Sequence, residues 1–75
     1  MTAFKTFEAF AKARRRWQTF APWLGVKDTS HTAFLGRVRV RARRDGVALD
    51  EMTDWLAVGQ TVADEAEARA TRKTP

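Results

Sequence analysis

Residues 30–46 read SHTAFLGRVRVRARRDG, and the conformation of this segment decides the fold of the chain. At helical spacing, one narrow stripe recurs at i, i+3, i+4, i+7 and i+11, made of His31, Phe34, Leu35, Val38 and Ala42. Asp28, Thr29 or Ser30 can cap the first turn, and Gly46 can take the left-handed conformation after the last turn. These start and stop signals favour a helix.

The same segment also alternates charged and apolar residues from 37 to 43, as a half-buried strand does. With a strand there, the order strand, helix, Gly59, helix is similar to ribbon-helix-helix repressors, obligate dimers whose paired strands place alternate side chains in the major groove. That plan leaves the aromatic N-terminal 30 residues without a place, and the mostly alanine final helix offers little for a dimer core. It remains the alternative.

The composition predicts a single small helical domain spanning residues 1–75, with residues 71–75 as a frayed tail. So short a chain buries only about 60% of its unfolded surface, so its core must be rich in aromatic residues. Three Trp and five Phe supply that core. We expect a compact all-α bundle of three to five helices.

Two further helices are predicted, over residues 2–20 and from residue 50 onward. Pro22 should end the first helix, and the apolar connector after it should fold under the domain as a core plug. An exposed Trp23 would instead indicate a partner surface or base stacking. Asp50 is the expected cap of the last helix, which either breaks at Gly59 or continues through its alanines. At Gly59 the missing side chain permits close backbone approach.

The net charge of +5 conceals a strong asymmetry. Residues 1–44 hold 11 Lys or Arg and 2 acids, a net charge of +9, whereas residues 45–75 hold 3 basic residues and 7 acids, a net charge of −4. The first part could therefore present an electropositive surface to phosphate, and the second part could not.

The inventory of reactive side chains is poor. The chain has no Cys and no Tyr, and His31 is its only His, so we expect no enzyme, no metal site and no cofactor. His31 is expected to be a structural residue near the helix cap. There is neither an apolar run of about 18 residues nor a signal peptide's apolar core, so we expect a cytoplasmic protein without membrane contact.

Binding is the function class that remains. The central helix should present Arg37, Arg41 and Arg44 as one row able to follow a phosphate backbone, and Arg15 and Arg16 could extend that row if the first helix lies alongside. Alternatively, these arginines only lay their stems along the core edge. Nucleic acid is the preferred partner. The alternative is protein interaction with an acidic surface, including self-association of the basic half of one copy with the acidic half of another.

From residue 23 onward the chain also resembles the YozE type of SAM-like helical domain. The positions that carry the resemblance are Trp23-Leu24, Leu35-Gly36, Arg44-Asp45 and Trp55-Leu56, which span about half of the chain. The family often has an acid after the Gly, where this chain has Arg37. The resemblance implies a compact bundle of four or five helices in a family of small bacterial proteins, and it transfers no functional residue. A phage or plasmid accessory protein belongs to the protein-interaction alternative.

Overall fold

Three α-helices and one 3-10 turn form the computed structural model, which describes residues 2–73. In chain order they are α1 (Thr2–Phe20), the turn η1 (Ala21–Leu24), α2 (His31–Asp45) and α3 (Met52–Lys73). The prediction of an all-α bundle is confirmed, at three helices rather than the four or five that the resemblance implied. Residues 2–73 contain no strand.

The alternative with a strand at 37–43 is wrong, because these residues lie inside α2. Phe34, Val38 and Ala42 are all buried. A strand that buried Val38 and Ala42 would also bury Val40 between them, whereas Val40 is 69% exposed, as helical spacing requires. The alternation of Arg and Val was compatible with both conformations, and burial of this stripe selects the helix.

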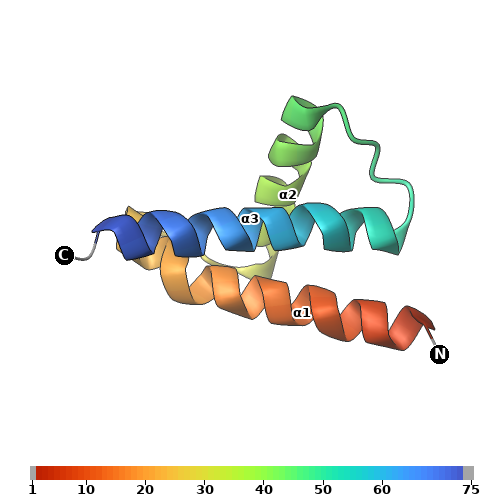
Figure 1. The fold of residues 1–75 in the computed structure, drawn as a ribbon, viewed down its shortest axis with the longest axis horizontal. Coiled ribbons are helices and arrows are strands. Elements are labelled where there is room, and N and C mark those ends of the chain that lie inside the picture. Colours follow the sequence, from red (N-terminus) through yellow and green to blue (C-terminus); the bar gives the residue numbers. More distant parts are fainter. Residues whose placement is uncertain (1, 74–75) are drawn as a thin grey trace.

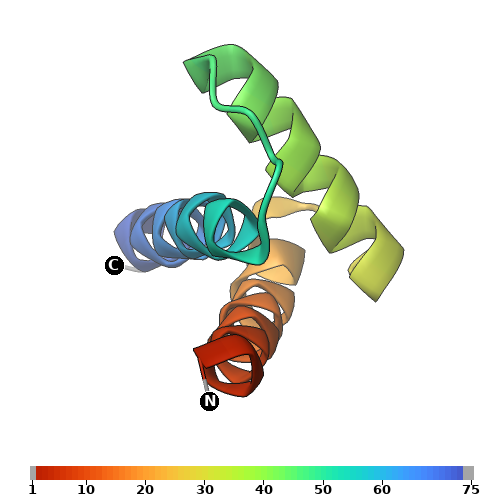
Figure 2. The same ribbon diagram turned by 90° about the vertical axis from the view of Figure 1, so that its right-hand side faces the viewer.

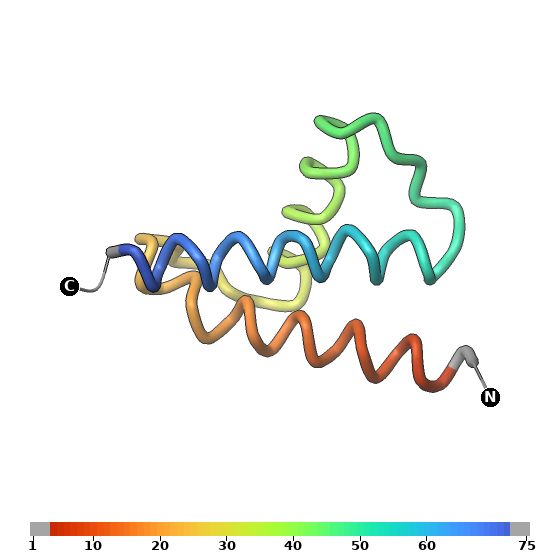
Figure 3. The backbone as a smooth tube through the Cα atoms, viewed as in Figure 1, coloured from red at the N-terminus to blue at the C-terminus, as the bar shows by residue number. Residues whose placement is uncertain are grey.

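Helices α1 and α3 lie side by side and run in the same direction, and α2 crosses them steeply (Figure 1). Seen along the pair, α2 leans across one side of it and extends outward past α3 (Figure 2). The chain then returns from the far end of α2 to the start of α3 through residues 46–51 (Figure 3). Most of one long side of α2 therefore faces solvent.

The core lies where the three helices meet. Phe34 of α2 is fully buried at its centre, and its ring centroid is 5.4 Å from that of Phe10 and 5.4 Å from that of Trp17, both on α1. Helix α3 contributes small residues to this core, namely Val58, Gly59, Ala63, Ala66 and Ala70. Large buried side chains of α1 and α2 thus pack against small buried residues of α3.

Gly59 does not break α3, which continues unbroken to Lys73. A Cβ at this position would lie 3.0 Å from Cε1 of Phe10 and 3.4 Å from Cζ of Phe34. The close backbone approach predicted for this glycine is confirmed. It is the point at which all three helices are in contact.

The predicted ends of α2 are also confirmed. The Oγ of Ser30 accepts a hydrogen bond from the backbone N–H of Ala33 at 3.1 Å, which caps the first turn. Gly46 has φ 69° and closes the last turn, with its N–H donating back to the carbonyl groups of Ala42 and Arg43. The capping serine and the glycine after the last turn each bond backbone groups within four residues of themselves, which is why they could be predicted from the sequence.

The start of α3 differs from the prediction. The helix begins at Met52, and the capping carboxylate belongs to Asp54 rather than Asp50: Oδ2 of Asp54 accepts from the backbone N–H groups of Asp50 and Glu51, at 3.2 Å and 3.0 Å. A carboxylate in the first turn that reaches back to the residues before it is half of a capping box. At the other end, α3 continues through Lys73, so residues 71–73 of the predicted frayed tail are helical; residues 74–75 lie outside the described residues.

The connector after α1 is only partly the predicted core plug. Leu24 and Val26 pack against the core, but Trp23 is 57% exposed and contacts Phe20 edge to face. Phe4 and Phe7, near the start of α1, are exposed as well. None of the helices described is both long enough and apolar enough to cross a bilayer.

Candidate nucleic-acid interface

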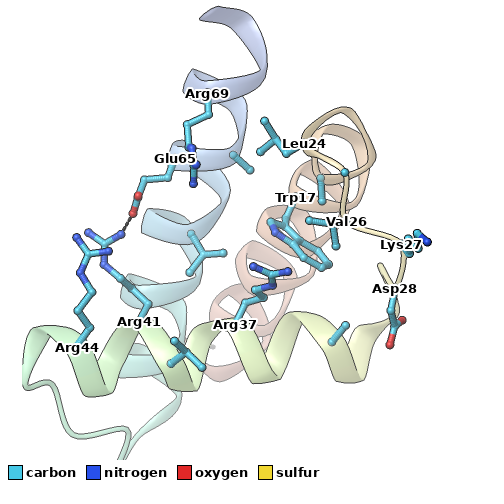
Figure 4. Close-up of a pocket in the computed structure, with 16 residues that line it drawn as sticks. Trp17, Leu24, Val26, Lys27, Asp28, Arg37, Arg41, Arg44, Glu65 and Arg69 are labelled. Carbon is cyan, nitrogen blue, oxygen red and sulfur yellow. Dashed lines mark ion pairs between the residues drawn. The ribbon is translucent and has the colours of Figure 1, made fainter. Parts of the chain in front are cut away.

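The five arginines of α2 divide between the two edges of its buried stripe, as the helical interpretation requires. Arg37, Arg41 and Arg44 rise from α2 on one side, beside α3 (Figure 4). On the opposite edge, the guanidinium carbon of Arg39 lies 5.4 Å from the centroid of the Trp55 ring, a cation–π contact. The structure therefore brings together three of the five arginines predicted from sequence to bind phosphate, and the other two, Arg15 and Arg16, are on α1.

These three arginines line a groove between α2, α3 and the segment that follows η1, which we call the α2–α3 groove. Its volume is about 650 Å³. Apolar and small side chains line it, among them Trp17, Leu24, Val26, Val40, Val62 and Ala66. Its charged lining residues are Lys27, Asp28, Arg37, Arg41, Arg44, Glu65 and Arg69.

Cations outnumber carboxylates five to two in this lining. Hydrogen bonds from the backbone and the side chain of Ser30 hold the pKa of the exposed Asp28 below its ordinary value, so this carboxylate is charged at neutral pH. Counted at formal charges, the lining carries a net charge of +3. The groove is thus basic around an apolar surface.

Arg41 is less available to bind phosphate than Arg37 and Arg44 are. Its Nε donates to Oδ2 of Asp45 at 2.7 Å, and its Nη1 forms an ion pair with Glu65 of α3. Arg37 and Arg44 are exposed, and neither has a carboxylate within ion-pair distance among residues 2–73. In the row predicted from sequence, Arg37 and Arg44 are therefore available to bind phosphate. Arg41, between them, is neutralised by carboxylates of the protein.

Arg15 and Arg16 do not extend this row. Arg16 reaches the other side of α3, where it pairs with Asp64 and lies 3.4 Å from Oε1 of Glu67. Arg15 is exposed on α1 and lines no part of the groove. The extension required α1 to lie alongside α2. Helix α1 lies alongside α3 instead, and the carboxylates of α3 pair with Arg16.

Arg69 and Lys27 are two lining residues that the sequence did not single out. Arg69 stands at i+4 from Glu65, the spacing of a helical ion pair, but Glu65 pairs with Arg41 of α2. Arg69 extends from α3 toward the groove (Figure 4). Its place between the buried alanines Ala66 and Ala70, at the edge of the core stripe, was the available signal.

His31 has the structural surroundings that were expected of it. It is exposed in the first turn of α2, and its Nδ1 lies 3.1 Å from Nη1 of Arg14, which tethers α2 to α1. Across the described part of the chain, no cluster of three or more His, Asp or Glu residues could hold a metal ion. A second concave site, of about 410 Å³, is lined by Arg16, Asp64, Glu67 and Arg72, but there Arg16 already pairs with both carboxylates.

Comparison of the chain with protein-family models, with curated proteins and with solved structures finds no match.

Proposed function

We propose that this protein is a non-enzymatic module that binds nucleic acid through α2. The observation that carries the proposal is the set of exposed α2 arginines without an ion-pair partner among residues 2–73, namely Arg37, Arg39, Arg43 and Arg44. Helix α2 projects from the α1–α3 pair (Figure 2), and the side chains of all four arginines are exposed. Phosphate contacts of this kind are independent of sequence and sensitive to salt.

Internal pairing explains why nucleic acid is favoured over self-association by charge. The acidic residues of α3 that would meet the basic half of a second copy are already engaged inside the molecule: Asp64 and Glu67 by Arg16, and Glu65 by Arg41. Self-neutralisation removes most of the acidic surface of α3 but leaves α2 strongly positive. The charge left over matches a polyanion better than a copy of the same chain.

The test is binding to fluorescently labelled DNA, followed by anisotropy at low and moderate salt. The variant Arg37→Ala/Arg44→Ala should bind about tenfold more weakly than the parent, because it loses two phosphate-binding groups. Its control is Lys5→Ala/Lys12→Ala, which removes the same charge from exposed positions on α1. Arg41 is left intact, since its loss would unpair Glu65. Absence of DNA binding at low salt would end the proposal.

Protein interaction is the second candidate, and the exposed aromatic side chains favour it. Phe4, Phe7 and Trp23 are 67%, 64% and 57% exposed, and large exposed apolar side chains are typical of protein contacts. Sedimentation of the protein alone over a range of concentrations separates the two candidates. Self-association that disappears in Phe4→Ser/Phe7→Ser, with DNA binding unchanged, would assign the aromatic surface to protein contact.

A further inference from the structure

We propose that the α2–α3 groove receives an unpaired strand of nucleic acid, with phosphates on its basic groups and a base against its apolar lining. This inference rests on the proposed function and specifies which form of nucleic acid the protein prefers. The groove, rather than the outward side of α2, is then the principal contact surface.

The apolar part of the lining is the first reason. Leu24 and Val26 approach the groove from the segment after α1, and Val62 approaches it from α3. Val40, on the α2 side, is 69% exposed. A phosphate gains nothing from such a surface, whereas the face of a base releases water when it packs there.

The concave shape is the second reason. In a duplex the faces of the bases are covered by stacking, and only their edges are open to a protein in the grooves. In an unpaired strand the faces are accessible and can pack against protein side chains. A groove of about 650 Å³ is within the range of about 300–1,000 Å³ that ligand sites occupy, so it suits a nucleotide rather than a double helix.

The arrangement of charge is the third reason. Arg37 and Arg44 rise from α2 while Arg69 extends from α3, so guanidinium groups flank the apolar lining on two sides (Figure 4). None of the three has a carboxylate partner among the described residues. A planar guanidinium can donate two parallel hydrogen bonds to a phosphate, which fixes the backbone while the base enters.

The first experiment compares ligands of equal length: single-stranded DNA, the same strand without bases, and the duplex. The base-containing strand should bind about tenfold more tightly than the other two, because only that strand offers accessible base faces to the apolar lining. Equal binding of the abasic strand would show that bases are not contacted. Duplex binding as tight as that of the single strand would overturn the proposal as well, and in either case the proposed function stands.

The second experiment compares two triple variants that remove the same charge. Arg37→Ala/Arg44→Ala/Arg69→Ala removes three cations of the groove, whereas Lys5→Ala/Lys12→Ala/Arg72→Ala removes three exposed cations outside it. The groove variant should bind single-stranded DNA at least about tenfold more weakly, and the control less than about threefold more weakly. Equal losses would overturn the proposal, because they would indicate attraction by net charge alone. Circular dichroism checks that both variants retain the helical fold.

Amide chemical shifts then locate the strand on the unmodified protein. Binding should shift the resonances of residues 24–28 and the indole N–H of Trp17, which line the groove. Shifts confined to Thr32, Arg39 and Arg43 would place the ligand outside the groove and overturn the inference. An acidic peptide that displaces the strand at equal charge would also overturn it, in favour of a protein ligand. Failure of every nucleic acid to bind would instead end the proposed function itself.

Discussion

Gly59 is the residue at which the packing of all three helices is most restrictive. A methyl group here would meet the rings of Phe10 and Phe34, which are both buried and in contact with one another. Gly59→Ala gains about 1 kcal/mol of helix propensity, but overpacking a well-filled core costs about 1–3 kcal/mol. We expect a net loss of about 1 kcal/mol in the free energy of unfolding, measured by urea denaturation.

Gly36 is the matched control, because it is a helical glycine of the same chain with open space around it. Gly36→Ala should raise the free energy of unfolding by about 0.5–1 kcal/mol, through helix propensity alone. If the two substitutions had the same sign, the close contact at Gly59 would not limit stability.

Glu65 competes with any anionic ligand for Arg41. The guanidinium of Arg41 forms ion pairs with Asp45 and Glu65, so the Glu65 carboxylate occupies the position in which a phosphate would bind Arg41. Glu65→Gln should raise the affinity for nucleic acid about threefold to tenfold, because it removes one negative charge from the lining and releases one side of Arg41. The affinity is measured by fluorescence anisotropy at fixed salt.

Glu8 on α1 provides the control for this prediction. It is exposed, and no ion pair involves it among residues 2–73. Glu8→Gln changes the net charge by the same amount and should leave the affinity nearly unchanged. An equal gain in both variants would assign the effect to net charge rather than to competition at Arg41.

At the scale of single residues, the sequence predicted which side chains emerge together but not how they pair. The spacing of Arg37, Arg41 and Arg44 placed them on one flank of α2. One partner of Arg41, Asp45, is local at i+4, but the other, Glu65, lies 24 positions further along the chain, on another helix. Pairing across elements depends on the crossing of helices, which no local spacing encodes.

At the scale of elements, the cap of α2 is the feature that can be tested most directly. The Oγ of Ser30 satisfies the N–H of Ala33, and no other side chain accepts a hydrogen bond from that group. Ser30→Ala should lower the free energy of unfolding by about 1 kcal/mol, equivalent to a fall of about 4–8 °C in Tm. Thermal denaturation followed by circular dichroism measures this change.

Thr29 is the natural comparison, since Asp28, Thr29 and Ser30 were equally acceptable caps by sequence. Among the described residues, Thr29 is held only through its backbone carbonyl, which accepts a hydrogen bond from Nε2 of Gln18, and this bond survives substitution of the Thr29 side chain. Thr29→Ala should therefore change Tm by less than about 2 °C. A larger loss there than at Ser30 would assign the cap to the wrong residue.

The bounds of the helices were predictable because their signals are local. Pro22, Ser30 and Gly46 each act on backbone groups within a few residues of themselves. The start of α3 was missed because two acids, Asp50 and Asp54, both suit a first turn, and the choice depends on side-chain reach. The exposure of Trp23 was missed because apolar composition does not determine on which side of a short turn a ring lies.

At the scale of the whole molecule, the groove results from three segments that are distant in sequence. It requires α2 to cross α3 and residues 24–28 to pass beside that crossing. The sequence showed that positive charge is concentrated before residue 45. A count of charges along the chain could not reveal that carboxylates of α3 neutralise Arg16 and Arg41 and leave Arg37 and Arg44 unpaired. Internal pairing therefore removes Arg16 and Arg41 from the positive surface, and four of the remaining cations line the groove.

This localisation predicts how binding depends on salt. Four cations of the groove have no carboxylate partner among the described residues: Lys27, Arg37, Arg44 and Arg69. For single strands, log K falls with log salt concentration with a slope of about −0.7 per phosphate neutralised, so four contacts give a slope of about −3. Arg37→Ala/Arg44→Ala should reduce its magnitude by about 1.5, and Lys5→Ala/Lys12→Ala should leave it nearly unchanged.

The slope also measures how many cations act together, which affinity alone does not. If all ten arginines and four lysines bound phosphate, the slope would approach about −10, and removing any two would have the same effect. A slope near −3 that responds only to groove substitutions requires most of the positive charge to be either paired internally or turned away from the strand. Titration of single-stranded DNA at a series of salt concentrations decides between these cases, because a diffuse surface and a defined groove differ about threefold in this quantity.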